Sequence, residues 1–277
     1  MDSRLTGKTV VVTGASGGIG REIVRSFIGE GASVAIHYHR NQESADALAA
    51  ECTTESAADR TTVVAADLRD EAAVVNLFEQ TKQHLGVPNV LIANAGAWPI
   101  PHMSIDEMTL EQWNNTVSVN MTSVFLCVRE FLKLTKASGQ QDPAIVMIGS
   151  TAGHFGEAGH ADYAASKGAF MTGLMNSLKN EITRFARHGR INTVCPGWTL
   201  TPMADRLTGN RDAMERALQT IALRKFGAPK DIANAVTFLA SNQLAGHITG
   251  QSLFVSGGME GRVVNLPDEV SIEEAGL

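Results

Sequence analysis

The sequence has no feature that indicates a membrane or a nucleic acid as its partner. No stretch of about eighteen consecutive apolar residues occurs, and the first residues include no long hydrophobic segment, so we expect neither membrane insertion nor secretion. The formal net charge is −6, and Lys and Arg never cluster beyond a neighbouring pair. Because nucleic acids and anionic membranes attract basic surfaces, this composition favours small-molecule chemistry.

Cysteine is also scarce, and Cys52, Cys127 and Cys195 are widely separated along the chain. An odd number of cysteines in apolar or helical contexts predicts reduced interior residues and no disulfide framework. His37 and His39 alternate along a run of strand-forming residues, but no third ligand lies near them in the sequence, so we expect no metal site. These features predict a cytoplasmic enzyme or binding protein.

Short β-branched runs alternate with longer helical patterns along the 277 residues. The near-continuous apolar runs predict buried strands at Thr9–Thr13, Ser33–Tyr38, Thr61–Ala65, Val90–Ala93, Ala144–Gly149, Ile191–Cys195 and Ser252–Val255. Helical patterns lie between them at about Gly18–Glu30, Gln42–Cys52, Glu71–Leu85, Leu110–Ala137, Ala161–Arg187 and Lys230–Ser241. The alternation predicts an α/β fold, a single Rossmann-like doubly wound parallel sheet of seven strands with helices on both faces. The length suits one domain over residues 1–277.

Two segments interrupt this alternation. Residues 196–226 are mostly polar, which predicts a mobile flap over a site. The chain ends in an acidic tail over residues 259–277, with Asp268, Glu269, Glu273 and Glu274. The tail is either a contact for a partner or a disordered end.

The stretch TGASGGIG, residues 13–20, places its glycines between the first predicted strand and the first predicted helix. Backbone amides at a helix N-terminus bind anionic phosphate, and missing side chains let a diphosphate approach the main chain. The spacing differs from the G-x-G-x-x-G fingerprint, and the G-K-[ST] ending of a nucleoside-triphosphate loop is missing. Taken alone, the stretch fits either a dinucleotide site or a tight turn without a ligand.

A series of motifs follows the order that one protein family uses. They are TGASGGIG at 13–20, Asp67, ANAG at 93–96, Asn120, Ser150, the Tyr163-Ala-Ala-Ser-Lys167 segment and Pro196-Gly197. From residue 7 to about residue 258 the chain therefore resembles the short-chain dehydrogenase/reductase family, and within it the β-ketoacyl carrier-protein reductase-like branch. The resemblance implies an oxidoreductase that reduces a ketone to an alcohol with NADPH, assembled as a homotetramer or homodimer.

The resemblance also implies a catalytic set of Asn120, Ser150, Tyr163 and Lys167. Tyr163 would donate a proton to the substrate carbonyl oxygen, and Ser150 would hydrogen-bond the same oxygen. Lys167 would hold the nicotinamide ribose, and Asn120 would support a water that relays protons to it. Tyr163 and Lys167 lie four positions apart on a predicted helix and so share a face. An ammonium about 4 Å from the phenol favours the phenolate by roughly 4 kcal/mol, which would lower the pKa of Tyr163 from about 10 to about 7.

The end of the second predicted strand bears on the choice of cofactor. An NAD enzyme places Asp or Glu there, whereas this chain has no carboxylate between His37 and Glu43. Arg40 can pair with a 2′-phosphate through its planar guanidinium, so we expect NADP(H) in preference to NAD(H). The alternative for Arg40 is an exposed loop charge, and for His37 ordinary packing. The expected cofactor-binding residues are Gly14, Ser16, Gly17, Gly18, Ile19, Gly20, His37, Tyr38, Arg40, Asp67, Leu68, Asn94, Ala95, Gly96, Tyr163, Lys167, Pro196, Gly197 and Thr199.

Candidates for substrate binding lie in the segments around this expected site: Trp98, His154, Phe155, Trp198 and Met203. Their largely aromatic and apolar character indicates a bulky, partly hydrophobic carbonyl compound. Packing within loops explains each residue equally well. Arg129, Lys133 and Lys136 form no basic patch beside the site, which disfavours an acidic carrier protein and favours a free small-molecule ketone.

Two other functions stay open at this point. NADP-linked alcohol oxidation would use the same residues in reverse, and the sequence does not separate the two directions. An NADP-binding protein recruited to a non-redox step is a further alternative, although such a protein would gain nothing from a phenol placed beside an ammonium. The predicted helix Leu110–Ala137 carries more apolar surface than one sheet face needs, so it forms either an oligomer interface or packing against the sheet.

Overall fold

The centre of the protein is a sheet of seven parallel strands. In a computed structural model that describes residues 2–56, 60–99, 102–204 and 210–275, the strands pair in the order β3-β2-β1-β4-β5-β6-β7. Their bounds are β1 Thr9–Val12, β2 Ser33–Tyr38, β3 Thr61–Ala65, β4 Val90–Ala93, β5 Ala144–Ile148, β6 Arg190–Pro196 and β7 Ser252–Val255. The order reverses beside β1, because the chain leaves β3 at one edge and returns to β4 on the other side of β1. The predicted Rossmann-like, doubly wound sheet is confirmed.

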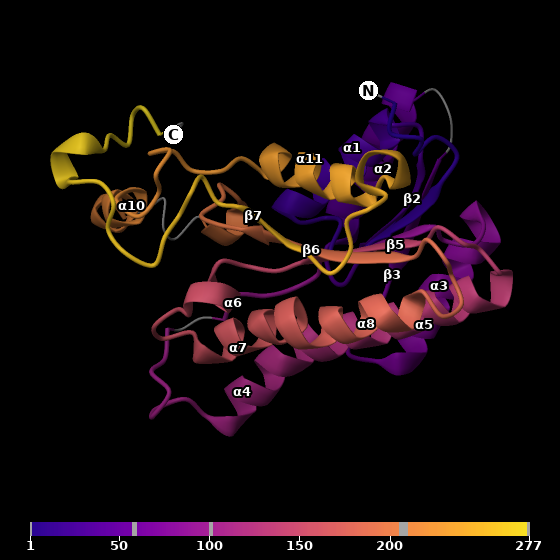
Figure 1. The fold of residues 1–277 in the computed structure, drawn as a ribbon, viewed down its shortest axis with the longest axis horizontal. Helices are drawn as coiled ribbons and strands as arrows, with labels where there is room; N and C mark the ends of the chain where they lie inside the picture. The colour runs from indigo at the N-terminus through magenta and orange to yellow at the C-terminus, as the bar shows by residue number, and fades with distance from the viewer. Residues whose placement is uncertain (1, 57–59, 100–101, 205–209, 276–277) are drawn as a thin grey trace.

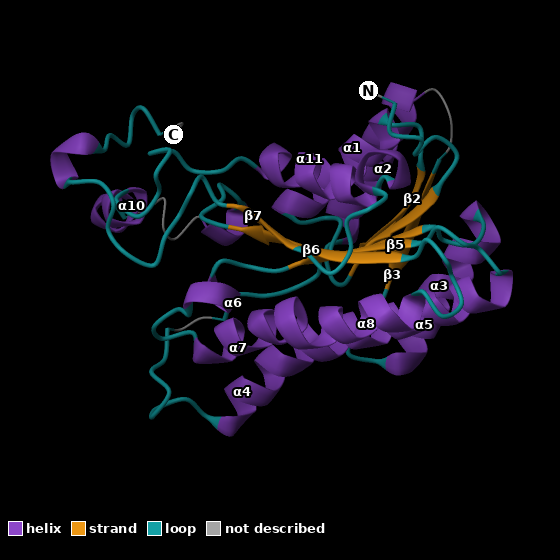
Figure 2. Ribbon diagram, viewed as in Figure 1, coloured by secondary structure: helices purple, strands orange, loops and turns teal. Residues whose placement is uncertain are grey.

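Helices cover both faces of this sheet (Figures 1 and 2). One face carries α1 Gly18–Gly29, α2 Gln42–Ser56 and α11 Pro229–Ala240. The other face carries α3 Glu71–Leu85, α5 Ser123–Ser138 and α8 Met175–Ile182, with α4 Leu110–Val117 and α7 Ala161–Ala169 continuing toward one end of the sheet. The remaining short helices are α6 Ala152–Phe155, α10 Arg211–Leu218 and α12 Asn242–Ala245, with 3-10 turns at Pro202–Ala204 and Pro267–Glu269. Within the described chain, no helix is long and apolar enough to span a membrane.

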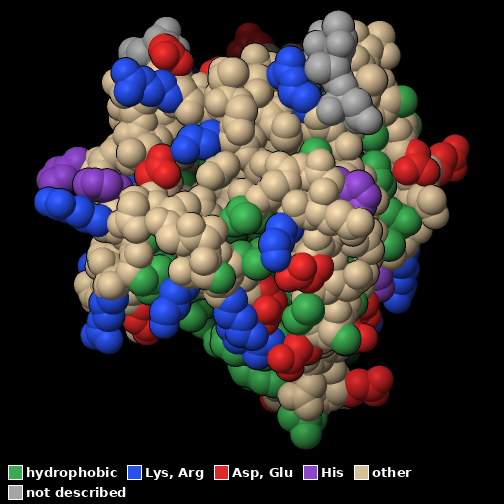
Figure 3. All heavy atoms as spheres, turned by 90° about the vertical axis from the view of Figure 1, so that its right-hand side faces the viewer, with side chains coloured by type: hydrophobic (Ala, Val, Ile, Leu, Met, Phe, Trp, Pro, Cys, Tyr) green, Lys and Arg blue, Asp and Glu red, His purple; other side chains and the backbone are tan. Residues whose placement is uncertain are grey.

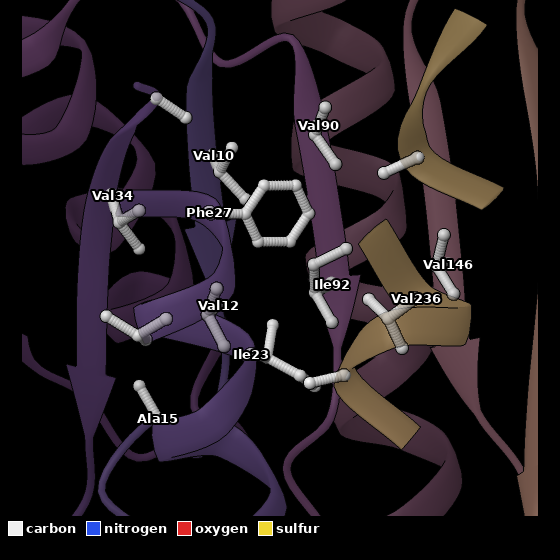
Figure 4. Close-up of a cluster of buried hydrophobic side chains, with 14 of the residues drawn as sticks. Val10, Val12, Ala15, Ile23, Phe27, Val34, Val90, Ile92, Val146 and Val236 are labelled. Carbon is white, nitrogen blue, oxygen red and sulfur yellow. The ribbon is translucent and has the colours of Figure 1, made fainter. Parts of the chain in front are cut away.

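β-branched side chains pack the sheet against its helices. All four residues of β1 are buried, which agrees with a central strand covered on both faces. Figure 4 shows Val10 and Val12 of β1 beside Phe27 of α1, with Ile92 of β4 on the neighbouring strand. Phe27 is fully buried, and burial of one such side chain stabilises a fold by about 1.5–3 kcal/mol. Cys52, Cys127 and Cys195 are interior residues, as expected.

Two long helices predicted as continuous are interrupted by π-helical turns. The first consists of α4, a π turn η1 at Ser118–Thr122, and α5. The second consists of α7, a π turn η2 at Phe170–Leu174, and α8, which ends at Ile182 and not at the predicted Arg187. A π turn adds only one residue to the regular helical repeat, so the spacing of apolar residues before and after it does not predict the interruption. Both turns lie in helices that carry expected catalytic residues.

The chain after β6 and its acidic end pack on one another. Met214 and Leu218 of α10 form a small apolar cluster with Ile221, Phe226 and Ala275. Backbone hydrogen bonds join the two stretches, because the amides of Val264 and Asn265 both donate to the Gln219 carbonyl at 2.8 and 3.0 Å. We call α10 and residues 259–275 the cap, which lies beyond one end of the sheet (Figure 1). Neither sequence alternative for the tail anticipated this packing, and residues 205–209 of the predicted flap lie outside the described residues.

Candidate active site

A cavity of about 1180 Å³ lies where the strands of the sheet end at their carboxyl termini. Most of the residues predicted for the site line it: Gly14, Ser16, Gly17, Gly18, Ile19, Gly20, His37, Arg40, Asp67, Leu68, Asn94, Ala95, Gly96, Trp98, Ser150, Phe155, Tyr163, Lys167, Pro196, Gly197, Trp198, Thr199 and Met203. Parallel strands place their following loops at one edge, so segments far apart in the sequence meet there. Tyr38, Asn120 and His154 do not line this cavity.

The glycine turn is shaped by close approaches that exclude side chains. Gly14 has φ +62°, and a Cβ there would lie 2.9 Å from the Cα of Ala95. A Cβ on Gly20 would overlap the Gly14 carbonyl oxygen and lie 2.8 Å from the Cα of Ala15. The turn therefore folds back onto the first turn of α1, whose N-terminus opens into the cavity. This cradle fits a dinucleotide diphosphate, because it presents main-chain amides without side chains in front of them.

The buried His37 side chain stabilises the glycine turn through a hydrogen bond. Its Nδ1 accepts a hydrogen bond from the Gly14 amide at 2.9 Å, and its Nε2 lies 3.0 Å from the Ala66 carbonyl oxygen, so the partners assign the neutral tautomer protonated at Nε2. Burial lowers the pKa of His37 to about 4. Since both ring nitrogens are occupied by backbone groups, His37 holds the turn and β3 in register although its side chain also lines the cavity.

The adenosine end of the predicted site carries more charged side chains than the sequence motifs indicated. Arg69 donates to both carboxylate oxygens of Asp67, from Nε to Oδ1 at 2.9 Å and from Nη2 to Oδ2 at 2.6 Å. His39 Nε2 lies 3.6 Å from Asp67 Oδ2. The Arg69 guanidinium holds the pKa of Asp67 well below its usual range. Arg21, His39 and Arg69 join Arg40 on the cavity wall and had not been predicted. Arg21 lies on α1 directly after the glycine stretch. His39 and Arg69 belong to no motif, and the pairing of β2 with β3 brings the segments that carry them together.

Tyr163 and Lys167 lie on α7, and both face the cavity with Ser150. The Lys167 ammonium donates to the Ile148 carbonyl at 2.9 Å and lies 5.8 Å from the centre of the Tyr163 ring. Burial raises the pKa of Tyr163 to about 12, partly opposed by a hydrogen bond with Ser150, and lowers the pKa of Lys167 to about 8. The expected lowering of the Tyr163 pKa by the ammonium is therefore wrong for this arrangement, because desolvation outweighs any such attraction.

Asn120 lies in the π turn η1 and is completely buried. Its Oδ1 accepts from the Ala97 amide and its Nδ2 donates to the Ala97 carbonyl, both at 2.8 Å. A Cβ on Gly96 would meet Asn120 Oδ1 at 2.8 Å and Lys167 Nζ at 3.2 Å. Asn120 is thus packed behind the ANAG loop and beside Lys167, and its two hydrogen bonds with Ala97 hold that loop.

The opposite end of the cavity is mainly apolar. Trp98, Phe155, Trp198 and Met203 line it, as predicted for substrate binding. His154 instead makes edge contacts with the rings of Phe155 and Phe254, 4.8 and 5.1 Å between centroids. Tyr38 packs against the core cluster beneath α1 and α2.

Sequence reasoning missed several further residues at this end. They are Thr151, Glu157, Asn210, Ala213 and Met259. Glu157 could have been noticed, because it lies six positions before Tyr163 in a glycine-rich loop. Met259 comes from the cap, whose position no local pattern predicts.

The fold and this cavity define a Rossmann-like α/β protein with its site at the carboxyl edge of the sheet. Residues 14–260 match the protein family described as enoyl-(acyl carrier protein) reductase. The chain is 32% identical over 255 residues to a 3-oxoacyl-[acyl-carrier-protein] reductase of Synechocystis, which covers 92% of this chain and 98% of the relative. It is 35% identical to nodulation protein G of Rhizobium, with the same coverage of both chains.

A solved structure agrees with these relatives. The crystal structure of a short-chain dehydrogenase/reductase from Brucella melitensis, titled a glucose/ribitol dehydrogenase, matches with a TM-score of 0.84 at 29% identity and covers 94% of this chain and 99% of that one. The chain belongs to the short-chain dehydrogenase/reductase family, which confirms the resemblance. It is an oxidoreductase that acts on carbonyl or hydroxyl groups.

Proposed function

We propose that the protein reduces a ketone to an alcohol with NADPH, and that Tyr163 is the proton donor. The observation that carries the proposal is the placement of Tyr163, Ser150 and Lys167 on one wall of the cavity whose other end is the glycine cradle. NADPH, when bound, supplies the hydride that reduces the carbonyl carbon. The cradle and the helix N-terminus at Gly17 and Gly18 suit its diphosphate.

The protein's own residues then have distinct tasks. Tyr163 keeps its proton near neutral pH, because burial raises its pKa to about 12, so it is available to donate to the carbonyl oxygen as negative charge develops there. Ser150 lies within hydrogen-bond reach of the phenol and can bind the same carbonyl oxygen. Lys167 lies beside Gly96, where it can bind a ribose hydroxyl and stabilise the charge on Tyr163 after proton transfer. Asn120 holds the adjoining loop through Ala97.

The basic cavity end supports NADP(H) over NAD(H). Arg40, Arg21 and Arg69 line this end, and Arg69 is already paired with Asp67. A 2′-phosphate adds negative charge that guanidinium groups bind well, whereas no free carboxylate from β2 is present to accept from a 2′-hydroxyl. We therefore assign the 2′-phosphate to Arg40.

The substrate that we propose is a free small-molecule ketone. Arg129 is paired with Glu71 at 2.6 Å and with Glu130 at 2.9 Å, and Lys133 is paired with Glu130 at 2.8 Å. These pairs reduce the attraction of the surface for an acidic carrier protein. On the face shown in Figure 3, basic and acidic side chains are likewise interspersed.

We also propose a cytoplasmic homo-oligomer, either a tetramer or a dimer. Met121 and Phe125 in the η1–α5 region are 37% and 45% exposed, and Leu253 and Phe254 on the edge strand β7 are 38% and 37% exposed. Apolar side chains on an edge strand and a helix are more stable when a second copy covers them. Sedimentation of a single 29.5 kDa species would contradict this assembly.

The proposed reaction is tested by NADPH oxidation against a panel of ketones, from small diketones through β-keto thioesters to bulky aromatic ketones. Tyr163→Phe should lower kcat/KM by about a thousandfold or more, since it removes the proton donor and leaves the ring, while the NADPH dissociation constant stays within about twofold. Ketone reduction that survives in this variant would contradict the role of Tyr163. NADPH binding without reduction of any ketone would favour a non-redox role.

A further inference from the structure

The loop between α6 and α7 brings one carboxylate, Glu157, to the apolar end of the cavity. The indole Nε1 of Trp98 donates to Glu157 Oε1 at 3.1 Å. His160 is only 3% exposed, its ring stacks on Trp98 with 4.3 Å between centroids, and its Nδ1 lies 3.6 Å from the same carboxylate oxygen. His160 Nδ1 is buried without a hydrogen-bond partner. Trp98 and His160 together fix where the carboxylate points.

Glu157 has two histidine neighbours, His160 and His102, whose positive charge would favour the carboxylate, but it has no Lys or Arg partner in the described chain. Among the described residues no Lys or Arg lies within ion-pair distance of it, whereas Asp67, also on the cavity wall, is held by Arg69. Its side chain is 24% exposed, and burial raises its pKa. Trp98 occupies one lone pair of Oε1, and no donor of the described chain is hydrogen-bonded to Oε2. An ionised carboxylate has about four acceptor positions, so Glu157 has capacity for a further donor.

Glu157 faces the same cavity as Ser150 and Tyr163, the reacting centre of the proposed function. Burial is the main cause of the raised pKa of Tyr163, and the negative charge of Glu157 adds a smaller rise. Phe155, Trp198 and Met203, which line the same cavity, offer apolar contact and no charge. A carboxylate in an apolar wall beside a proton donor attracts hydrogen-bond donors and repels anions.

We propose that Glu157 is a specificity-determining residue that selects ketones carrying an O–H or N–H donor next to the carbonyl. The substrate class is therefore α-hydroxy and α-amino ketones, and keto acids are rejected. Trp98 and His160 are positioning residues, which act by orienting the carboxylate. This inference rests on the proposed ketone reduction and assigns its substrate class.

The discrimination between ketones depends on whether the bound ketone gives Glu157 Oε2 a hydrogen-bond donor. A hydroxyl or ammonium group satisfies the open Oε2, whereas a methyl group of similar size covers it and leaves it without a partner. A site built around a hydrogen bond rejects the analogue that lacks the donor far more strongly than an apolar pocket rejects one methylene. A carboxylate on the substrate would meet Glu157 as a like charge at short range.

Four phenyl ketones of one skeleton test the proposal: α-hydroxyacetophenone, α-aminoacetophenone, propiophenone and phenylglyoxylate. The quantity compared is the ratio of kcat/KM for each ketone to that for propiophenone, in the wild type and in Glu157→Leu. Comparing this ratio between the wild type and the variant cancels the differences in intrinsic reactivity among the four ketones. We expect Glu157→Leu to lower the hydroxy and amino ratios by about tenfold or more and to raise the phenylglyoxylate ratio.

Three further variants separate specificity from structure. Glu157→Gln retains an acceptor oxygen but loses the negative charge. It should therefore keep part of the preference for the hydroxy ketone and lose the preference for the amino ketone. Trp98→Phe should lower both ratios less than Glu157→Leu does, because the carboxylate remains but loses its indole donor. Glu79→Gln on α3 is the control for the loss of a carboxylate elsewhere and should leave every ratio unchanged.

The outcomes distinguish this inference from the proposed function. If Glu157→Leu lowers kcat/KM for all four ketones by the same factor, Glu157 is only structural and the inference is wrong. If the wild type reduces none of them, the proposed function fails for this class, and calorimetric binding of the same compounds with NADP⁺ present still decides the inference. Equal affinities in the wild type and Glu157→Leu would then overturn it.

Discussion

The two ends of the cavity are built from different kinds of structure. The cofactor end, by which we mean the wall formed by residues after β1, β2, β3 and β4, uses strand ends and one helix N-terminus that are fixed by the buried sheet. The substrate end consists of the loop before α7, the segment after β6 and Met259 of the cap. The cofactor end depends on backbone positions and on close contacts between backbone segments. The substrate end depends on side chains carried by loops. Cofactor binding should therefore fail when the backbone is disturbed, whereas substrate choice should change through single side chains.

The largest effect on NADPH affinity should come from Gly20→Val at the cofactor end. The new side chain would collide with the Gly14 carbonyl and with Ala15, so the turn would have to move away from the helix. We expect the NADPH dissociation constant to rise about a hundredfold, or roughly 2.7 kcal/mol, together with a lower Tm. Fluorescence titration with NADPH and thermal melting measure the two effects.

Gly29→Ala is the matched control on the same helix. A Cβ at Gly29 meets nothing within 4 Å, so this variant should bind NADPH as the wild type does. Equal affinities for Gly20→Val and Gly29→Ala would show that the glycine turn is not the diphosphate site.

His37 makes the cofactor end sensitive to acid. Its pKa is about 4 in the folded protein and about 6.5 in an unfolded chain, so between these values the unfolded state binds a proton that the folded state does not. Its contribution to the free energy of unfolding is complete above about pH 6.5, falls as the pH drops through this window and amounts to about 3 kcal/mol.

Urea unfolding at several pH values between 7.5 and 4 would measure this loss. In His37→Gln, which keeps an acceptor and a donor but does not titrate, the pH dependence should be shallower by that amount. Parallel pH profiles for the two proteins would contradict the assignment.

Arg40→Ala tests the charge at the cofactor end without moving its backbone. Loss of a guanidinium–phosphate pair should raise the dissociation constant of NADPH about thirtyfold, or about 2 kcal/mol, and leave that of NADH within about twofold. Lys82→Ala on α3 removes a cation elsewhere and should change neither affinity. If NADPH and NADH weaken equally in Arg40→Ala, Arg40 does not bind the 2′-phosphate.

Asn265→Ala tests whether the substrate end is independent of the cofactor end. Asn265 is buried in the cap, donates to the Ile221 carbonyl at 2.8 Å and accepts from Arg224 at 3.2 Å. Its removal should cost about 1–2 kcal/mol of unfolding free energy and raise the ketone KM, while NADPH affinity stays unchanged. Weaker NADPH binding in this variant would show that the two ends are coupled. Glu274→Ala, on an exposed part of the cap, is the control.

The sequence alone determined the sheet, the helices that cross it and the segments that meet at its edge. Apolar runs at strand length and the glycine turn are local signals, and the order of the motifs identified the family. These features can be predicted from the sequence because parallel strands buried on both faces require continuous β-branched runs. A close approach between two backbone segments likewise requires glycine.

Only the tertiary structure decided the rest. It placed the cap against the segment after β6, set Arg69 against Asp67, brought Trp98 and His160 to Glu157, and gave Tyr163 a raised pKa in place of the expected lowered one. Desolvation and pairing depend on neighbours distant in the chain, so no spacing in the sequence predicts them. Motifs located the site, and the packing around it set its charges and its shape.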